Sequence, residues 1–453
     1  MTDTVVIGAG LAGLSAAIRL AEAGQKVTLL SFGLGGIQLG QGTIDVLGYR
    51  GADTLVERPF DEFAAWATEH PDHPYSLLGA DVVRDSVDWL AARLPDLLVP
   101  GDGRNHPLPT AVGAMRPTYL VQPSMVWPDP TSVAVVGPAQ IKDFYPHLVA
   151  ANLAVTAQVE ATGYRIDLPA RAGEAESSPV VYAKALEDPD VLARFAEAVL
   201  DQIGDEDAVV LPAILGLHQC VQPQLAALLK RPVVEALLPP PSIPGMRINE
   251  ALTAQAKAAG VRVILGSKVT GFESDGSRVT AVTLHQAGRD QSYPASHVVF
   301  APGGFESAAL VMDSYGTITE PVFDLPLAGL DRDDLITGDY WADQAIFAVG
   351  TRVDQSCRPL TGDGEVVYEN LHTVGGLLAG AIRWTEKSGD GIAVASALRA
   401  ADAILSPTGT WSPPASPTDQ PPAPEVVQTL QEDAEDDADP ATTPSPPEED
   451  ENV

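Results

Sequence analysis

The sequence predicts an α/β fold in which a glycine loop joins a buried strand to a helix. An apolar, β-branched run at 4–7 leads directly into Gly-Ala-Gly-Leu-Ala-Gly at 8–13, and helical spacing of apolar residues follows. A second apolar strand at 26–30 completes a βαβ unit. Two later strands, within 298–304 and 366–376, also end in glycine pairs. These patterns predict a Rossmann-type parallel sheet that binds a nucleotide or flavin.

The three glycines of the first loop have separate expected roles. Gly8 makes the tight turn, Gly10 lets the backbone approach a phosphate, and Gly13 lets the helix pack closely on the strand. The motif has the strand before it and the helix after it that such a site requires. The alternative is a glycine-rich turn that binds no ligand.

The end of the second strand lacks a residue that dinucleotide sites usually have. An Asp or Glu at this place accepts the ribose hydroxyls of the adenosine half of the cofactor. This sequence has Ser31, which cannot make that charged contact. FMN has no adenosine and would not need the carboxylate, so the sequence favours FMN, with FAD as the alternative.

The segment 33–45 contains five glycines in thirteen residues and no basic residue. A loop of this composition can lay its backbone N–H groups against a flat ring or a phosphate. It resembles the small-residue loop that faces the isoalloxazine ring in flavoproteins of the succinate dehydrogenase and fumarate reductase type, whereas the alternative is a flexible surface loop. The cofactor-binding candidates in it are Gly40, Gln41, Gly42 and Thr43.

The C-terminal half supplies the remaining cofactor-binding candidates. Each follows a strand or begins a helix, which is where an open α/β sheet places its ligand. An alanine-rich helix running to about residue 405 would point its positive N-terminus at the pyrimidine edge of a flavin. The sequence therefore predicts a Rossmann-type FAD/NAD(P)-binding flavoprotein fold, with further site residues Gly303, Gly375, Gly376, Gly389, Asp390 and Gly391.

Composition excludes several other classes of protein. The chain of 453 residues has 27 Lys and Arg against 61 Asp and Glu, a net charge of −34, which disfavours binding to nucleic acid or anionic lipid. Its two cysteines, Cys220 and Cys357, are too few for a Cys-ligated iron–sulfur cluster or a four-Cys zinc site, and we predict no metal site. Cysteine usage and the absence of a signal-peptide pattern predict a cytoplasmic location.

We expect three regions along the chain. The flavin-binding domain is discontinuous and comprises 1–60 and 245–405, around an inserted mixed α/β region at 61–244 that could form a subunit interface. Residues 406–453 form a predicted disordered tail, because from residue 407 onward there are 12 acidic residues, 11 prolines and no Lys or Arg. The uncharged stretch 208–229 contains two prolines and several polar residues, so we predict a buried strand and a loop rather than direct membrane insertion.

From residue 1 to about 405 the chain resembles the B subunits of anaerobic glycerol-3-phosphate dehydrogenases. The resemblance is carried by the glycine motif at 8–13, His-Pro-Tyr-Ser-Leu-Leu-Gly at 73–79, Val-Trp-Pro at 126–128 and Gly-Met-Arg-Ile at 245–248. It implies a three-subunit complex that oxidises sn-glycerol 3-phosphate to dihydroxyacetone phosphate. In that complex the catalytic A subunit carries FAD, the B subunit is assigned FMN, and the C subunit holds iron–sulfur clusters at the membrane. Electrons pass to a quinone, with fumarate or nitrate as final acceptors, and the B subunit is peripheral on the inner face of the membrane through its partners.

The sequence shows no clear catalytic constellation. His73 and Arg247 lie in family-like segments and are the candidates for handling a proton or an anion, although each could instead anchor a loop or form an ion pair. Three interpretations stay open: a free-standing flavin oxidoreductase acting on a small anion, an electron-relay flavoprotein subunit, and an interaction subunit that has lost its cofactor.

Overall fold

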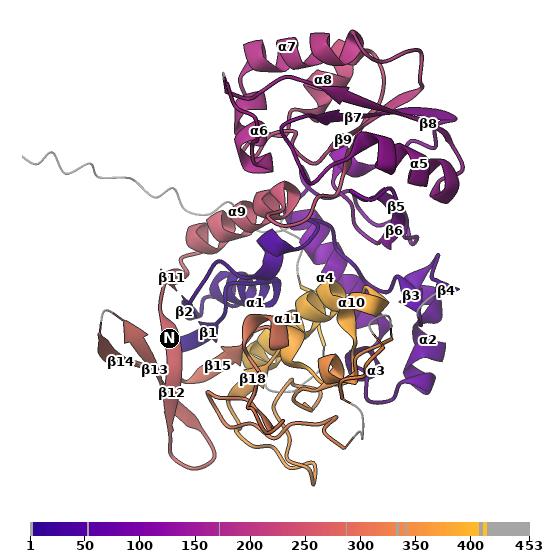
Figure 1. Cartoon of the computed structure of the whole chain (residues 1–453). Helices are drawn as coiled ribbons and strands as arrows, with labels where there is room; N and C mark the ends of the chain where they lie inside the picture. Colours follow the sequence, from indigo (N-terminus) through magenta and orange to yellow (C-terminus); the bar gives the residue numbers. More distant parts are fainter. Residues whose placement is uncertain are drawn as a thin grey trace, which may run out of the picture. The chain divides into compact units, whose positions relative to one another are not determined.

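Segments from both halves of the chain form one five-stranded parallel sheet (Figure 1). Its order is β11 (Arg262–Leu265), β2 (Lys26–Ser31), β1 (Asp3–Ile7), β15 (His297–Phe300) and β18 (Leu371–Thr373). The register pairs Val5 with Thr28 on one side and with Val298 on the other. The predicted α/β class with a parallel sheet is therefore confirmed. The structure is a computed structural model that describes residues 3–51, 54–171, 173–286, 288–331, 335–339, 342–406 and 411–414.

The two faces of this sheet are covered differently. On one face Val6, Leu29 and Val299 pack against helices, and on the other Val5 and Phe300 pack under an antiparallel sheet. This alternation follows from the two-residue period of a strand. The helices are α1 (Leu11–Glu22), α4 (Ala80–Arg93), α9 (Ile243–Ala258) and α11 (Gly389–Leu405), and the antiparallel strands are β12 (Lys268–Ser274), β13 (Val279–Gln286) and β14 (Arg289–Pro294).

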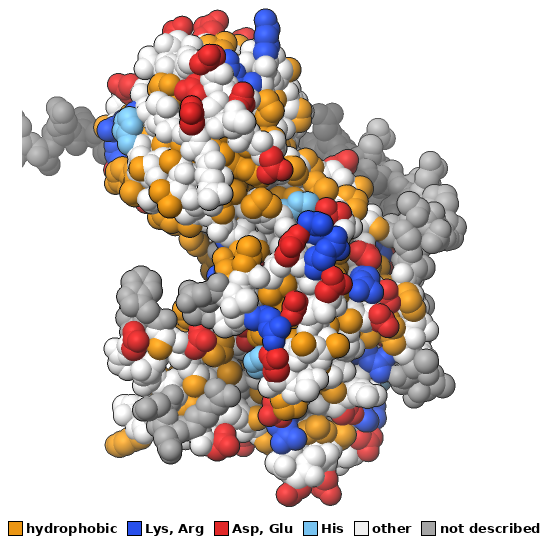
Figure 2. Space-filling view, turned by 90° about the vertical axis from the view of Figure 1, so that its right-hand side faces the viewer, with side chains coloured by type: hydrophobic (Ala, Val, Ile, Leu, Met, Phe, Trp, Pro, Cys, Tyr) orange, Lys and Arg blue, Asp and Glu red, His pale blue; other side chains and the backbone are white. Residues whose placement is uncertain are grey.

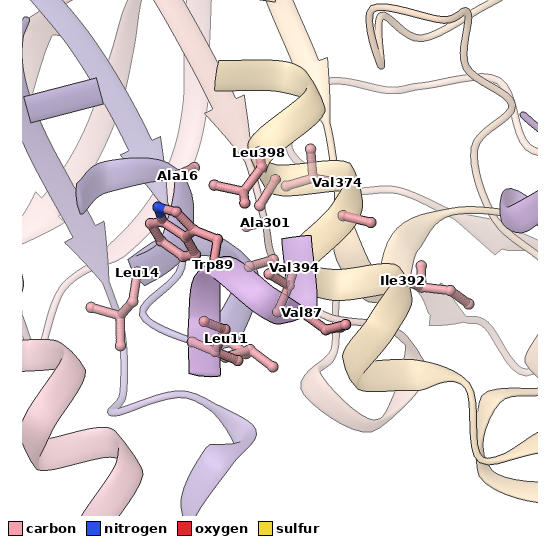
Figure 3. Packing of buried hydrophobic residues seen from close by; sticks show 14 of the residues in the cluster. Leu11, Leu14, Ala16, Val87, Trp89, Ala301, Val374, Ile392, Val394 and Leu398 are labelled. Atoms are coloured by element: carbon pink, nitrogen blue, oxygen red, sulfur yellow. The ribbon is translucent and has the colours of Figure 1, made fainter. Parts of the chain in front are cut away.

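The α1, α4 and α11 helices meet in one apolar cluster (Figure 3). Small side chains such as Ala16 lie beside large ones such as Trp89, so the helices approach closely and leave little empty space. Burial of a large apolar side chain stabilises a fold by roughly 1.5–3 kcal/mol. This cluster fixes the helix ends that face the carboxyl edge of the sheet.

A second parallel sheet lies within the region that we predicted as a mixed insertion. Its order is β10 (Val233–Ala236), β9 (Ala208–Pro212), β7 (Ser132–Pro138) and β8 (Glu160–Ile166). It packs with α5 (Pro146–Thr156), α6 (Pro179–Leu186), α7 (Pro189–Leu200) and α8 (Gln222–Leu229) around a core of its own. The boundaries 61 and 244 stay predictions.

The remaining elements are short. They are α2 (Pro59–Glu69), α3 (Pro74–Leu78), α10 (Arg383–Glu386), β3 (Tyr49–Arg50), β4 (Thr54–Leu55), β5 (His106–Pro109), β6 (Met115–Thr118), β16 (Val311–Met312) and β17 (Ile318–Thr319), with 3-10 turns at Gly36–Leu39, Pro123–Met125, Phe305–Ser307, Ala345–Ala348 and Gly375–Leu377.

Two local sequence signals account for the bounds of neighbouring elements. The Asp-Gly pair at 275–276 lies in the hairpin turn that joins β12 to β13. Helix α9 begins at Ile243, where Ser242 accepts a hydrogen bond from Gly245 N and Pro244 occupies the first turn.

Charged side chains are mixed on the surface. Figure 2 shows Lys and Arg side chains lying next to Asp and Glu on the face in view. Within the described residues, no helix is long and apolar enough to cross a membrane. The stretch 208–229 consists of β9, a loop and α8. Most of the predicted tail 406–453 lies outside the described residues, which include only 406 and 411–414 of it.

Candidate functional site

The carboxyl edge of the five-stranded sheet opens into a cavity of about 1270 Å³. Residues at the ends of β1, β2 and β15 line it, as do the first turns of α1 and α11. Open α/β sheets bind their ligands at this edge, because strand ends and helix N-termini converge there.

The first turn of α1 presents free backbone amides to this cavity. Its N-cap is Gly10, no side chain caps the helix, and its first turn contains no acidic residue. Gly8 has φ +109°, and a Cβ there would come within 2.1 Å of Ala301 O, so this turn requires glycine. At Gly13 a Cβ would lie 1.9 Å from Gly8 O, which is the close approach of helix to strand. The arrangement can bind an anion at the helix N-terminus.

The end of β2 presents no carboxylate to the cavity. Ser31 Oγ donates to Gly33 O (2.7 Å) and accepts from Ala9 N (3.2 Å), so it ties two loops together. The neighbouring wall is made by Phe32, Ser267 and Lys268. None of these side chains can accept a hydrogen bond as an ionised carboxylate does.

The glycine-rich loop is held in place by the region at 61–244. Gln122 Nε2 donates to Gly42 O (2.8 Å) and to Pro244 O (2.9 Å). Gly42 has φ +73°, and a Cβ there would lie 2.3 Å from the Pro244 carbonyl carbon. The loop is therefore positioned by contacts that are distant in the sequence.

Charged side chains line another part of the cavity, where Asp45 and Arg116 are buried and Asp390 and Lys387 are partly buried. Asp45 N donates to Asp390 Oδ2 (3.1 Å), and Arg116 Nη2 donates to Asp45 Oδ2. Burial, and then the Asp45 carboxylate, raise the pKa of Asp390 to about 7. Burial, and then Arg116, lower the pKa of Lys387, which also lines the cavity. Sequence reasoning assigned no role to Asp45 or Arg116.

The predicted proton-handling candidate His73 does not line the cavity. It is buried, its Nδ1 accepts from Tyr75 N (3.0 Å), and its Nε2 lies 3.0 Å from Glu386 Oε2. The Tyr75 hydroxyl donates to Val46 O and Ser388 O. The segment 73–79 therefore joins the Asp45 loop to the start of α11.

The other candidate, Arg247, is also outside the cavity wall. It donates to Glu235, to Gln122 Oε1 and to the carbonyls of Leu215 and Gly216. Its guanidinium joins α9 to β10 and to the loop after β9.

The comparisons with known proteins agree with this geometry. Residues 3–392 match the family model described as an FAD binding domain. The B subunit of the anaerobic glycerol-3-phosphate dehydrogenase of Yersinia enterocolitica is 31% identical over 425 residues, covering 89% of this chain and 98% of the relative. The probable B subunit of the Halobacterium salinarum enzyme is 31% identical over 421 residues, covering 89% and 97%.

The chain belongs to this family of B-subunit flavoproteins. Among solved structures, the open conformation of a flavocytochrome c3 fumarate reductase matches with a TM-score of 0.43 and 12% identity, covering 89% of this chain and 78% of that one. The Rossmann-type flavoprotein fold predicted from the glycine loops is confirmed.

The cavity fits the flavin that this family binds. Uncapped amides at Gly10 suit a phosphate, and apolar backbone-rich loops suit a flat ring. Gly13 and Gly391 are at positions of close packing and are not among the residues that line the wall: a Cβ at Gly391 would lie 2.3 Å from the Tyr75 hydroxyl, and the role of Gly391 toward a flavin stays a prediction. The other predicted cofactor-binding residues all line the wall, and their contacts with a flavin stay predictions: Gly8, Gly10, Ser31, Gly40, Gln41, Gly42, Thr43, Gly303, Gly375, Gly376, Gly389 and Asp390.

Proposed function

We propose that the chain is the flavoprotein B subunit of an anaerobic glycerol-3-phosphate dehydrogenase. The complex oxidises sn-glycerol 3-phosphate to dihydroxyacetone phosphate and passes electrons to a quinone, with fumarate or nitrate as final acceptor. One observation carries the proposal: the similarity to relatives of that name spans 89% of this chain and includes the glycine loops that meet at one cavity.

Within the complex the chain acts as an electron relay. When bound, a flavin supplies two-electron redox chemistry. His73 and Arg247, the residues expected to serve a substrate, are both engaged in buried contacts away from the cavity wall, which supports a relay. The second candidate is a free-standing oxidoreductase acting on a small anion, which Arg116 and Lys387 in the cavity wall favour.

Anaerobic mixing of the purified chain with glycerol 3-phosphate distinguishes these functions. A relay shows flavin absorption that this substrate does not bleach until the FAD-containing A subunit is added. Bleaching by the chain alone supports the free-standing enzyme, and a purified chain that shows no flavin bands and takes up no added flavin supports the cofactor-less interaction subunit.

A glycine variant tests whether the cavity holds the flavin. Gly10 has φ −79°, and the nearest atom to an added Cβ is 4.0 Å away, so Gly10→Ala should fold normally. Its methyl group would lie where a phosphate approaches the helix, and we expect flavin affinity to fall at least ~10-fold, about 1.4 kcal/mol. Gly271→Ala, with open space in β12, is the matched control.

We assign FMN to the site, because Ser31, Phe32 and Lys268 offer no carboxylate for an adenosine ribose. Acid extraction and chromatography should recover FMN, and stoichiometric FAD would overturn the assignment.

A variant tests the assignment more directly. Ser31→Asp keeps an acceptor for Ala9 N and adds the missing carboxylate. A charge-assisted hydrogen bond is worth about 1.5–3 kcal/mol, so the preference for FMN over FAD should fall by ~10-fold or more.

The partners are the FAD-containing catalytic A subunit and an iron–sulfur, membrane-anchoring C subunit. The chain is then peripheral on the inner face of the membrane and held by contacts of the 61–244 region. In the tail only Val426, Val427 and Leu430 have the helical spacing of an apolar anchor, and no large apolar residue continues it, so the tail offers little to dock in a groove. Deleting 407–453 should therefore leave membrane-associated glycerol-3-phosphate:quinone activity intact, and loss of assembly would show that the tail is a docking element.

A further inference from the structure

We propose that Asp45, Asp390 and Arg116 form a proton-exchange site in the wall of the cavity, in which the two carboxyl groups hold one proton and exchange it with the flavin. The inference rests on the proposed flavin-carrying function and extends it to named groups. Neither His73 nor Arg247 takes part.

The hydrogen bonds join Asp45 to Asp390 through a backbone amide and distinguish between their two carboxyl groups. Asp45 Oδ2 accepts from Arg116 Nη2, whereas Asp390 Oδ2 accepts from the Asp45 backbone amide at 3.1 Å. Gly391 N donates to Asp45 O at 2.8 Å, so the first turn of α11 and the glycine-rich loop are joined on both sides of the pair. Asp45 is therefore the member that pairs with the Arg116 guanidinium, and the proposal places the proton on Asp390.

Unpartnered atoms in the group point to a missing ligand. Arg116 is about nine-tenths buried, and among the described residues its Nε and Nη1 have no hydrogen-bond partner, nor does Asp45 Oδ1. Buried polar groups are almost always paired, and leaving one unpaired costs about 1–3 kcal/mol. Asp390 is only partly buried and lines the cavity, so its carboxyl group is accessible to a bound molecule.

Burial and the neighbouring carboxylate explain why one proton stays on the pair. Together they raise the pKa of Asp390 to about 7, although the hydrogen bond from Asp45 N, then Arg116 and Arg383, act in the opposite direction. A neighbouring negative charge disfavours a second one, so one member of such a pair keeps its proton to a higher pH. The charged and titratable groups that face the pair are Tyr49 from β3, Tyr75 from α3, Arg116 from β6, Arg383 and Glu386 from α10, and Lys387 after it.

The proposed step conserves charge and atoms. A reduced donor supplies two electrons to the flavin: the flavin of the partner subunit in the complex, or dithionite in vitro. Asp390 gives its proton to a ring nitrogen, so that its O–H bond breaks and an N–H bond forms. Arg116 and Lys387 compensate the negative charge that this leaves on Asp390. The proton returns to Asp390 when the electrons leave the flavin.

The flavin-free chain tests the shared proton independently of the cofactor. Infrared difference spectra during a pH titration should show a protonated carboxyl band that disappears near pH 7. Asp390→Asn, which keeps an acceptor for Asp45 N, should lose this band. Asp45→Asn should move its midpoint to lower pH, because the like charge is gone and Arg116 is left beside Asp390. A wild-type chain without the band, or a band unchanged in both variants, would overturn the proposal.

The flavin-loaded chain tests the transfer itself. The midpoint potential of the flavin plotted against pH should bend near pH 7 in the wild type, and this bend should be lost in Asp390→Asn. Asp88→Asn, which replaces a carboxyl group with a raised pKa outside the cavity wall, is the control and should keep the bend. A bend that persists in Asp390→Asn contradicts the proposal. If the chain shows the infrared band but cannot be loaded with flavin, the proposed function alone has failed.

Discussion

Two buried arginines occupy contrasting environments in this molecule. Arg247 uses its Nε, Nη1 and Nη2 atoms for bonds to Glu235, Gln122 and backbone carbonyls. In the part of the chain that the structure describes, Arg116 bonds to Asp45, and its Nε and Nη1 atoms are unpartnered. Arg247 lies between secondary-structure elements, and Arg116 lies in the wall of the cavity at the carboxyl edge of the five-stranded sheet.

The difference separates a structural ion pair from one available for function. A buried charge needs its full set of hydrogen bonds if its only role is to hold the fold together. An incompletely bonded charge persists where a ligand completes the set or where the strain serves the chemistry. Both arginines are buried and paired with a carboxylate, so burial alone does not distinguish them.

The largest expected effect is from removal of Arg247. Arg247→Met leaves Glu235, which has 0% exposure, without its cation. Breaking a buried pair in this way costs about 3–5 kcal/mol of unfolding free energy. Urea unfolding of the flavin-free protein measures it, and Glu235→Met added to the variant should recover part of the loss. A loss below about 1 kcal/mol would contradict the structural role.

A smaller effect is expected at the residue that joins the Arg247 cluster to the cavity. Gln122→Ala removes the donor to Gly42 O and Pro244 O and one acceptor of Arg247. We expect about 1–3 kcal/mol of lost stability, together with weaker flavin binding, because the glycine-rich loop loses an anchor. The matched variant Gln140→Ala removes a buried amide from the loop after β7 and should leave flavin affinity unchanged.

Arg116→Met should lower the free energy of unfolding less than Arg247→Met or Gln122→Ala do. We expect a loss of about 1–2 kcal/mol at pH 7, because the adjacent carboxyl pair can take up a proton. The loss should shrink at pH 5. Flavin affinity should fall more than in Arg247→Met, so the arginine whose removal costs less stability costs more flavin affinity. Unfolding curves and flavin titrations at both pH values measure these losses. A larger loss of flavin affinity in Arg247→Met would contradict the distinction between a structural and a functional arginine.

Local patterns in the sequence were enough to predict the first sheet and much of the cavity wall. Gly8, Gly10 and Gly375 lie within three residues of the end of a strand, so their spacing indicates both the fold and the edge where a ligand binds. Arg116 could not be found in this way, because it lies in a four-residue strand and meets Asp45 across 71 positions. Asp45 ends the glycine-rich loop, but only the tertiary fold brings it to Asp390.

The second sheet was missed for a different reason. Prolines between 100 and 241 interrupt the periodic spacing of apolar residues from which helices and strands are predicted. Most helices of this region begin with proline in their first turn, including α5, α6 and α7, so the residues that interrupt the sequence pattern are the ones that start these helices.

The smallest expected effect is a change in the pH dependence of stability that comes from Asp390. Its folded pKa of about 7 is above the value of 3.8 for an unperturbed Asp. The folded state therefore binds more protons, and this contribution is fully present below about pH 4 and lost as the pH rises through about 7. Between pH 6 and pH 8 the loss of unfolding free energy is about 1 kcal/mol.

Unfolding curves across this range measure the slope of the unfolding free energy against pH. The slope should differ between the wild type and Asp390→Asn, whereas Asp207→Asn, at an exposed carboxylate with a lowered pKa, should not change it. Equal slopes in the wild type and Asp390→Asn would show that Asp390 is ionised at neutral pH, and the contrast between the two arginines would then depend on their hydrogen bonds alone.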